Sequence, residues 1–305
     1  MKKFDLITIL GPTASGKTAL AAQLAHKIGG EIISADSRQV YRGMDIGTGK
    51  DLDEYLLDGY KIPHHLVDIA APGEAYDLYR FVQDFYTAYD QIRSRGKQPI
   101  MCGGSGMYLE AVIGGYRLKP AQVNARWRSE WDQMSQGALV EMLKELRPLH
   151  NITDIRDRER LYRALEIALS GEGQNIADTK DAGLSLLIIG VDMPRALLRQ
   201  RITERLNARL EAGLVDEVQN LINRGVAPDK LRYYGLEYRY VTDYITGLTD
   251  YPTMVSLLNT AIHQFAKRQM TWFRRMEKKN ILIHWVDGNQ DVYKKLETIL
   301  QCLED

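Results

Sequence analysis

The hydrophobic and polar positions of the chain form two alternating kinds of segment. Short, nearly continuous apolar runs predict strands that are buried on both faces, as in a parallel sheet. They occupy residues 4–10, 31–35, 97–102, 184–191 and 281–286. Longer segments of helical character occupy residues 19–27, 76–95 and 290–303. Strands that alternate with helices predict an α/β protein with a parallel sheet at its centre.

The pattern changes near residue 119, after which no strand is predicted for about sixty residues. Residues 121–150 and 154–170 predict helices, and Trp127 and Trp131 are spaced to lie on one helix face. We therefore predict an all-helical subdomain inserted into an α/β core. The predicted core comprises residues 1–118 and 183–305, and the predicted insertion comprises residues 119–182.

Residues 11–18 read Gly-Pro-Thr-Ala-Ser-Gly-Lys-Thr, which matches the phosphate-binding loop (P-loop) pattern G-x-x-x-x-G-K-[ST]. The loop stands between a predicted strand and a predicted helix, so backbone N–H groups and the positive end of the helix dipole converge there. Lys17 would add a point charge, and the Thr18 hydroxyl is a potential Mg²⁺ ligand. The alternative, a tight turn without a ligand, is disfavoured because motif and context agree. The pattern indicates a polyphosphate without saying which molecule carries it.

Polar residues follow two of the predicted strands. Asp36 comes directly after strand 31–35, and Gly103-Gly104-Ser105 follows strand 97–102. Ligands of open α/β sheets bind beyond the carboxyl ends of the strands, so we expect Asp36 near the P-loop. From position alone, a turn or helix cap explains Asp36 equally well. Many P-loop nucleotidases carry an acidic residue after an apolar strand, and the absence of one near Ser105 argues against an NTPase.

Two basic segments lie in the second half of the chain. A helix predicted after residue 194 carries Arg201, Arg205 and Arg209 four residues apart, on one stripe. The stripe is either a solvated face paired with nearby glutamates or an anion clamp aimed at the ligand end of the sheet. Residues 267–275 mix cations with aromatic residues, as RNA-contacting surfaces do.

The charge balance limits the classes of partner. Lys and Arg total 40 and so do Asp and Glu, so a nucleic-acid surface must be a local patch rather than a property of the whole chain. Neither a signal peptide nor an apolar run of membrane length is visible, and Cys102 and Cys302 lie far apart, so we expect a cytoplasmic protein without membrane association. His64 and His65 could form a metal pair, but no further ligand has recognisable spacing, so structural roles are favoured.

Seven stretches, in order over almost the whole chain, resemble the bacterial tRNA dimethylallyltransferases, also called tRNA isopentenyltransferases. They are residues 11–18, 34–41, 45–50, 64–68, 103–108, 160–166 and 266–273. The P-loop alone is unspecific, but its combination with Asp-Ser-x-Gln-x-Tyr and Ala-Lys-Arg-Gln-x-Thr-Trp is specific. The resemblance implies a nucleotide-kinase-like P-loop core with a helical insertion.

The resemblance also implies a reaction, in which a dimethylallyl group passes from dimethylallyl diphosphate to N6 of adenosine 37, beside the tRNA anticodon. Asp36 is the implied general base, and Ser105, where the family has threonine, is implied to hydrogen-bond near the reacting amine. Lys17 and Arg205 are implied to stabilise the leaving diphosphate, with Mg²⁺ as cofactor held partly by Thr18. The implied diphosphate-binding residues are Gly11, Pro12, Thr13, Ala14, Ser15, Gly16, Lys17 and Thr18.

The implied partner is the anticodon stem-loop of tRNA, bound by a monomer. The implied tRNA-binding residues are Asp36, Ser37, Arg38, Gln39, Glu159, Arg160, Leu161, Tyr162, Arg163, Arg232, Lys267, Arg268, Gln269, Thr271, Trp272, Arg274 and Arg275. The chain departs from the family at Ser105, before Asp154, where a segment looks shortened, and at 233–239, where the family has Gly-Tyr-x-Glu. We expect no C-terminal zinc finger of the kind found in eukaryotic relatives.

Two other classes of function stay open. A nucleotide kinase, or a prenyltransferase acting on free AMP, could use the same fold, but a free nucleotide needs neither the insertion nor the 267–275 segment. A non-catalytic RNA-binding module with a vestigial P-loop is a further alternative. The intact Lys17, Thr18 and Asp36 argue against it.

Overall fold

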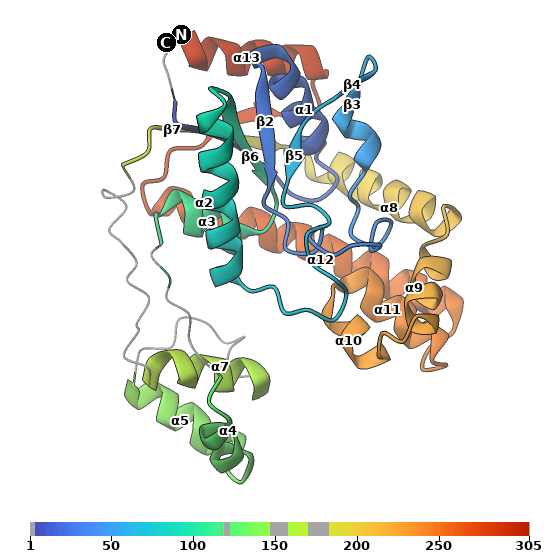
Figure 1. Cartoon of the computed structure of the whole chain (residues 1–305). Coiled ribbons are helices and arrows are strands. Elements are labelled where there is room, and N and C mark those ends of the chain that lie inside the picture. The colour runs from blue at the N-terminus through green and yellow to red at the C-terminus, as the bar shows by residue number, and fades with distance from the viewer. Residues whose placement is uncertain (1–3, 117, 119–122, 147–157, 170–182, 305) are drawn as a thin grey trace. The chain divides into compact units, whose positions relative to one another are not determined.

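A six-stranded parallel sheet forms the centre of the computed structural model, which describes residues 4–116, 118, 123–146, 158–169 and 183–304 (Figure 1). The strand order is β5-β2-β6-β1-β7-β8. The strands are β1 (Leu6–Leu10), β2 (Gly30–Ser34), β5 (His64–His65), β6 (Gln98–Gly103), β7 (Leu186–Asp192) and β8 (His284–Asp287). A separate antiparallel pair joins β3 (Leu56–Leu57) to β4 (Tyr60–Lys61). The predicted α/β class with a parallel sheet is confirmed.

Both faces of the sheet are covered, which explains why its strands are continuously apolar. In β1, Ile7 and Ile9 join a buried cluster with Leu20 of helix α1, and the flanking Leu6 and Leu10 are buried just as completely on the other face. Helix α2 lies in front of the sheet in Figure 1, while α1 and α13 pack against each other behind it.

Nine helices complete the described part of the core unit. They are α1 (Lys17–Ile28), α2 (Leu78–Ser94), α3 (Gly106–Ile113), α8 (Arg195–Glu211), α9 (Leu214–Asn223), α10 (Pro228–Tyr233), α11 (Leu236–Ile245), α12 (Tyr251–Lys278) and α13 (Val292–Glu304), together with the short 3₁₀ turn η1 (Leu52–Tyr55). The predicted basic segment 267–275 lies within the long helix α12.

The strand register brings several loops to one edge of the sheet. Leu10 at the end of β1 is aligned with Gly103 of β6 and with Gly190 of β7, and Ser34 of β2 is aligned with Cys102 of β6. Because the strands are parallel, the segments that follow them all begin at the same edge. This edge therefore holds the P-loop, Asp36 and the glycines after β6.

A second compact unit comprises residues 113–182, and the first comprises residues 1–112 and 183–305. The second unit contains α4 (Ala125–Asp132), α5 (Gln136–Leu146) and α7 (Arg158–Leu169). Its core gathers Trp131, Leu139, Leu143, Leu161, Tyr162, Ala164 and Leu165.

The single helix predicted over 121–150 is wrong within the described residues. The chain turns between α4 and α5, and the Ser135 hydroxyl caps the second helix by accepting a hydrogen bond from the Ala138 N–H at 3.2 Å. Apolar spacing continues through this turn, so periodicity alone did not reveal it. The segment before Asp154 that looked shortened lies outside the described residues.

Two details of the sheet also differ from prediction. Strand β5 was missed because it has only two residues, both histidines, which carry no strand signal. The last strand begins at His284 rather than residue 281, and Leu282 is 71% exposed.

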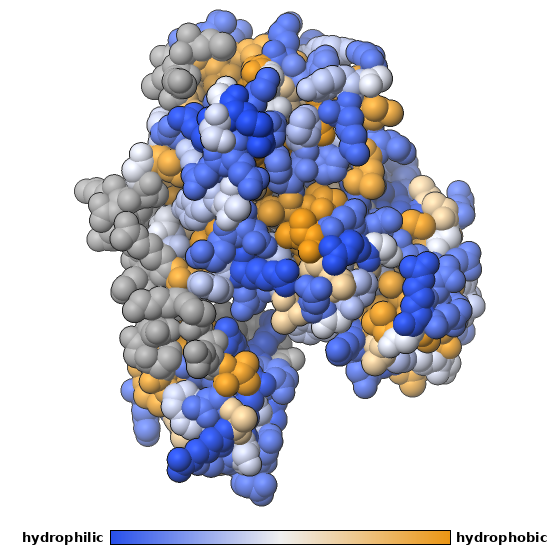
Figure 2. Space-filling model, in the orientation of Figure 1, coloured by the Kyte–Doolittle hydropathy of each residue, from blue (hydrophilic) through white to orange (hydrophobic). Residues whose placement is uncertain are grey.

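Hydrophilic residues predominate on the face in Figure 2, with apolar residues in small patches. Among the described residues, no helix is long and apolar enough to cross a membrane.

Candidate active site

The P-loop has the features of an anion-binding turn. It follows β1, and Gly16 adopts a left-handed conformation (φ 78°) that glycine tolerates without strain, directly before α1 begins at Lys17. Within the described part of the chain, the N–H groups of Gly16, Lys17 and Thr18 donate no hydrogen bond, and the buried Ser15 hydroxyl has no partner. Unused donors around a helix start form a site for a phosphate group.

Lys17 lies at this turn as an incompletely neutralised cation. Its Nζ donates to the carbonyl oxygen of Pro12 at 3.3 Å. Burial lowers the pKa of Lys17 below its ordinary value, and the neighbouring Arg205 lowers it too, while Cys102 and Asp36 act in the opposite direction. A bound polyanion would compensate the buried charge.

Arg205 reaches the P-loop from α8. Its guanidinium donates to the Thr13 hydroxyl at 3.3 Å and to the carbonyl oxygen of Gly49 at 3.4 Å, and it pairs with the Asp51 carboxylate. One member of the predicted arginine stripe is thus placed against the P-loop, as an anion clamp requires.

Gln269 ties the P-loop to the next strand. Its side-chain oxygen accepts the Thr13 N–H at 2.8 Å, and its side-chain nitrogen donates to the carbonyl oxygen of Gly104 at 2.9 Å. Gly104 is needed for this contact, because a Cβ there would lie 2.4 Å from the Gln269 nitrogen. Gln269 is buried, so the structure places this residue, assigned to tRNA binding by resemblance, inside the protein.

Asp36 and Ser105 come together at the ends of neighbouring strands. The Ser105 hydroxyl accepts the Ser37 N–H at 3.1 Å, and the Ser105 N–H donates to the Ala35 carbonyl at 3.3 Å. One carboxylate oxygen of Asp36 accepts the Arg38 N–H at 2.9 Å, and the other accepts no hydrogen bond within the described residues. Asp36 therefore closes a local turn and still keeps an oxygen available to a substrate.

The segment from Tyr41 to Asp51 is held by two charged residues that the sequence did not single out. The Glu217 carboxylate accepts the N–H groups of Asp45, Ile46 and Gly47 at 2.8, 2.8 and 2.9 Å. The buried Lys50 ammonium donates to the Tyr41 carbonyl at 2.7 Å and pairs with Asp45 and Asp68. These contacts fix the Gly49 carbonyl, which also accepts a bond from Gln39 at 3.0 Å. In the sequence, the one indication of this role was that Lys50 stands in a glycine-rich segment.

The predicted RNA-contacting stretch of α12 has one exposed and one inward face. The exposed residues include Lys267, Arg268, Thr271 and Arg274. Arg275 is engaged within the protein, since its guanidinium stacks 4.0 Å from the Trp272 ring centroid and pairs with Glu110 at 2.7 Å. The nearby Glu277 carboxylate accepts a hydrogen bond from the Trp285 indole at 2.8 Å.

Other residues assigned to tRNA binding also have internal partners. Arg232 pairs with Asp243 at 2.7 Å and with Asp229 at 2.8 Å. In the helical unit, Leu161 and Tyr162 are buried in the core. The flanking charges in that unit are paired as well, Glu159 with Arg128 at 2.9 Å and Arg163 with Glu166 at 3.5 Å.

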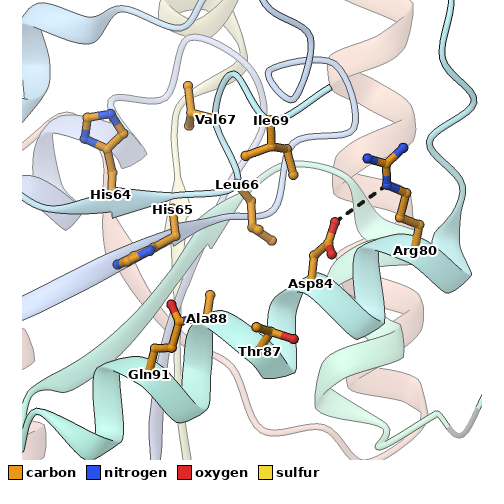
Figure 3. Close-up of a pocket in the computed structure, with 10 residues that line it drawn as sticks. All are labelled: His64, His65, Leu66, Val67, Ile69, Arg80, Asp84, Thr87, Ala88 and Gln91. Atoms are coloured by element: carbon orange, nitrogen blue, oxygen red, sulfur yellow. Dashed lines mark ion pairs between the residues drawn. The ribbon is translucent and has the colours of Figure 1, made fainter. Parts of the chain in front are cut away.

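A pocket of ≈ 410 Å³ lies away from the P-loop, between β5 and α2 (Figure 3). His64 and His65 border it, and both have internal partners. His64 stacks on Tyr55 with ring centroids 4.3 Å apart, and His65 bonds Glu31 at 2.8 Å. Within the described residues, no group of three or more His, Cys, Asp or Glu side chains could hold a metal. The structural interpretation of the two histidines therefore agrees with their contacts.

The Thr18 hydroxyl and the Glu54 carboxylate are oxygen ligands of the kind that Mg²⁺ prefers. The Glu54 carboxylate lies near Thr18 and Lys17, and burial raises the pKa of Glu54, as does Asp51. Mg²⁺ in phosphate-binding sites uses one or two protein oxygens and completes its shell with phosphate and water. The residues present fit such an ion.

The fold and the phosphate-binding turn define an α/β protein of the P-loop class. Two family models match the chain: IPP transferase over residues 39–276 and isopentenyl transferase over residues 4–62. A tRNA dimethylallyltransferase 2 of Phocaeicola vulgatus is 50% identical over 303 residues, 99% of each chain. The chain belongs to the IPP transferase family, the tRNA dimethylallyltransferases.

Solved structures of the same family share the fold. The full-length tRNA isopentenylpyrophosphate transferase of Bacillus halodurans superposes with a TM-score of 0.71 at 34% identity, covering 99% of this chain and 96% of that one. A eukaryotic dimethylallyltransferase acting on tRNA gives a TM-score of 0.74 at 25% identity, covering 94% of this chain and 74% of that one.

Proposed function

We propose that this protein transfers a dimethylallyl group from dimethylallyl diphosphate to N6 of adenosine 37 in tRNA, giving N6-isopentenyladenosine and diphosphate. Family membership supports the reaction. The observation that carries it is the placement of Asp36 and Ser105 beside the P-loop, to which Gln269 links the end of β6. A proton acceptor and an anion site thus stand at one edge of the sheet.

In this proposal, the free carboxylate oxygen of Asp36 accepts the proton of the attacking amine. The adenine N6 lone pair is delocalised into the ring, so removing its proton as the bond forms raises its reactivity. The N6–C1 bond forms while the C1–O bond breaks, and the electron pair of the broken bond passes to the diphosphate. Ser105, bonded to the Ser37 N–H, holds the backbone beside Asp36 in place.

In this proposal, the leaving diphosphate is stabilised by the backbone N–H groups of the P-loop and by the side chains of Lys17 and Arg205. These groups are already in position, so little reorganisation accompanies the growth of charge on the phosphate oxygens. Thr18 and Glu54 are the residues that would hold Mg²⁺, and the bound ion would supply further positive charge there.

The tRNA surface in this proposal begins at Arg38, two residues beyond Asp36. Its guanidinium lies 5.3 Å from the ring centroid of Tyr233, which is 64% exposed. An exposed aromatic ring next to a cation suits a nucleotide of the anticodon loop, which must open for adenosine 37 to leave its stack. Lys267 and Arg274 make no ion pair within the described residues and supply phosphate contacts.

The proposal is tested by incubating unmodified tRNA with the protein, Mg²⁺ and dimethylallyl diphosphate, then analysing the nucleosides by mass spectrometry. Isopentenyladenosine located at position 37 is the expected product. Parallel reactions with free AMP identify an adenylate prenyltransferase. Steady ATP hydrolysis stimulated by tRNA, without prenylated adenosine, would overturn the proposal.

A further inference from the structure

Helix α8 places a second arginine, Arg209, one turn beyond Arg205. The Arg209 side chain is 13% exposed, so its charge lies largely out of water. Its nearest anionic partner is Glu237 at the start of α11, with 3.4 Å between the Nη1 and Oε1 atoms. This distance is long for a charge-assisted hydrogen bond, which is normally 2.7–2.9 Å.

The Arg209 guanidinium is poorly satisfied by the protein. Its Nε is buried and has no hydrogen-bond partner in the described part of the chain, and the Glu237 contact is its one hydrogen bond there. Guanidinium carries five N–H donors, and buried charges are normally paired and hydrogen-bonded. Burial lowers the pKa of Arg209, and the neighbouring Arg205 lowers it further. An unsatisfied buried cation of this kind points to an absent anion.

Gly49 shows how close Arg209 lies to the P-loop and Arg205, where the diphosphate is proposed to bind. A Cβ at this residue (φ 63°) would lie 1.6 Å from Nη2 of Arg209 and 2.9 Å from Nη2 of Arg205. Both guanidinium groups therefore converge on one glycine, and Arg205 also contacts Thr13 of the P-loop. Within the described residues, the ion pairs of these two cations are Arg205 with Asp51 and Arg209 with Glu237.

We propose that Arg209 is a second guanidinium ligand of the diphosphate group, acting beside Arg205. The assignment rests on the proposed function in that the ligand is the diphosphate of the prenyl donor. A diphosphate presents more negative charge and more acceptor atoms than one guanidinium can satisfy. The pair with Glu237 holds Arg209 in the site until the anion binds.

The test removes both charges of the pair at once, in Arg209→Met with Glu237→Leu. Replacing a buried ion pair by apolar residues of similar volume avoids leaving one charge unpaired. The net charge is unchanged, so a loss of affinity reports a direct contact rather than a weaker general field. Binding of inorganic diphosphate with Mg²⁺ is measured by calorimetry. We expect affinity to fall by about 10- to 100-fold, as for one lost charged hydrogen bond or two.

Arg199→Met is the matched control, because Arg199 is an exposed arginine on the same helix, and its affinity should equal that of the parent. A second pair, Arg209→Gln with Glu237→Gln, removes the same charges and serves if the first pair does not fold. Parent-like affinity in the folded paired variant overturns the assignment. Prenylation by the parent is measured separately, so a parent that binds diphosphate without prenylating tRNA would refute the proposed function and leave the Arg209 result standing.

Discussion

Replacing Gln269 by leucine distinguishes an internal bridge from an RNA contact. The side chain spans the Thr13 N–H and the Gly104 carbonyl, at 2.8 and 2.9 Å, and leucine has a similar volume but no polar atoms. Gln269→Leu therefore loses two hydrogen bonds and leaves a donor and an acceptor without partners. Each buried unsatisfied group costs about 1–3 kcal/mol. Because the Thr13 N–H is only partly buried and can bond water in the variant, we expect a total of roughly 2–4 kcal/mol.

Urea denaturation of the free protein measures this loss. The midpoint should fall at unchanged m, because the variant folds to the same structure. The KM for dimethylallyl diphosphate should rise, since the P-loop loses its link to the end of β6. Thr271→Ala is the control, because this exposed hydroxyl bonds the Lys267 carbonyl of its own helix and no other group among the described residues.

The opposite result would support the assignment of Gln269 by resemblance. If Gln269→Leu had parent stability and parent KM for the diphosphate, but weaker tRNA binding, the bridge would be unimportant and the residue would face RNA. The contacts of Gln269 predict a different pattern: the variant loses stability and binds dimethylallyl diphosphate more weakly, but keeps its affinity for tRNA.

Four further predictions concern catalysis, pH, salt and stability. Asp36→Ala should lower kcat by on the order of 10²–10⁴ while leaving dimethylallyl diphosphate binding nearly unchanged, as measured by steady-state kinetics and calorimetry. The affinity for diphosphate should fall as pH rises through a pKa below 10.5, because Lys17 binds the anion only when protonated and burial lowers its pKa. Removing Lys267 and Arg274 together should flatten the log–log salt dependence of tRNA affinity by about 1.4, at about 0.7 for each contact with a single-stranded segment. Arg275→Ala should instead lower the urea midpoint, because Arg275 pairs with Glu110.

Each of the first three has an outcome that contradicts it. A drop in turnover of less than tenfold in Asp36→Ala means that another group accepts the proton. If diphosphate affinity still falls over the same pH range in Lys17→Met, the group that titrates is not Lys17. An unchanged salt slope in the double variant of α12 places the RNA surface elsewhere.

The local sequence determined the elements that depend on neighbouring residues. Continuous apolar runs predicted β1, β2, β6 and β7 because strands buried on both faces have no polar side. The P-loop was predicted because a glycine-rich turn between a strand and a helix requires particular residues at fixed spacing. Asp36 was predicted to lie near the P-loop because parallel strands end at one edge of a sheet.

Tertiary structure decided what each polar side chain contacts. Nothing near Gln269 in the sequence indicates that it bonds residues 256 and 165 positions away, and Arg275 and Arg232 look like free cations until Glu110 and Asp243 are placed beside them. The same holds for Arg209, which shares a regular stripe with Arg205 but lies buried against α11. The sequence alone does not distinguish a charged side chain that faces water from one that faces an internal carboxylate or a substrate. Its role is set by contacts between residues distant in the chain, which the pattern of apolar and polar positions does not encode.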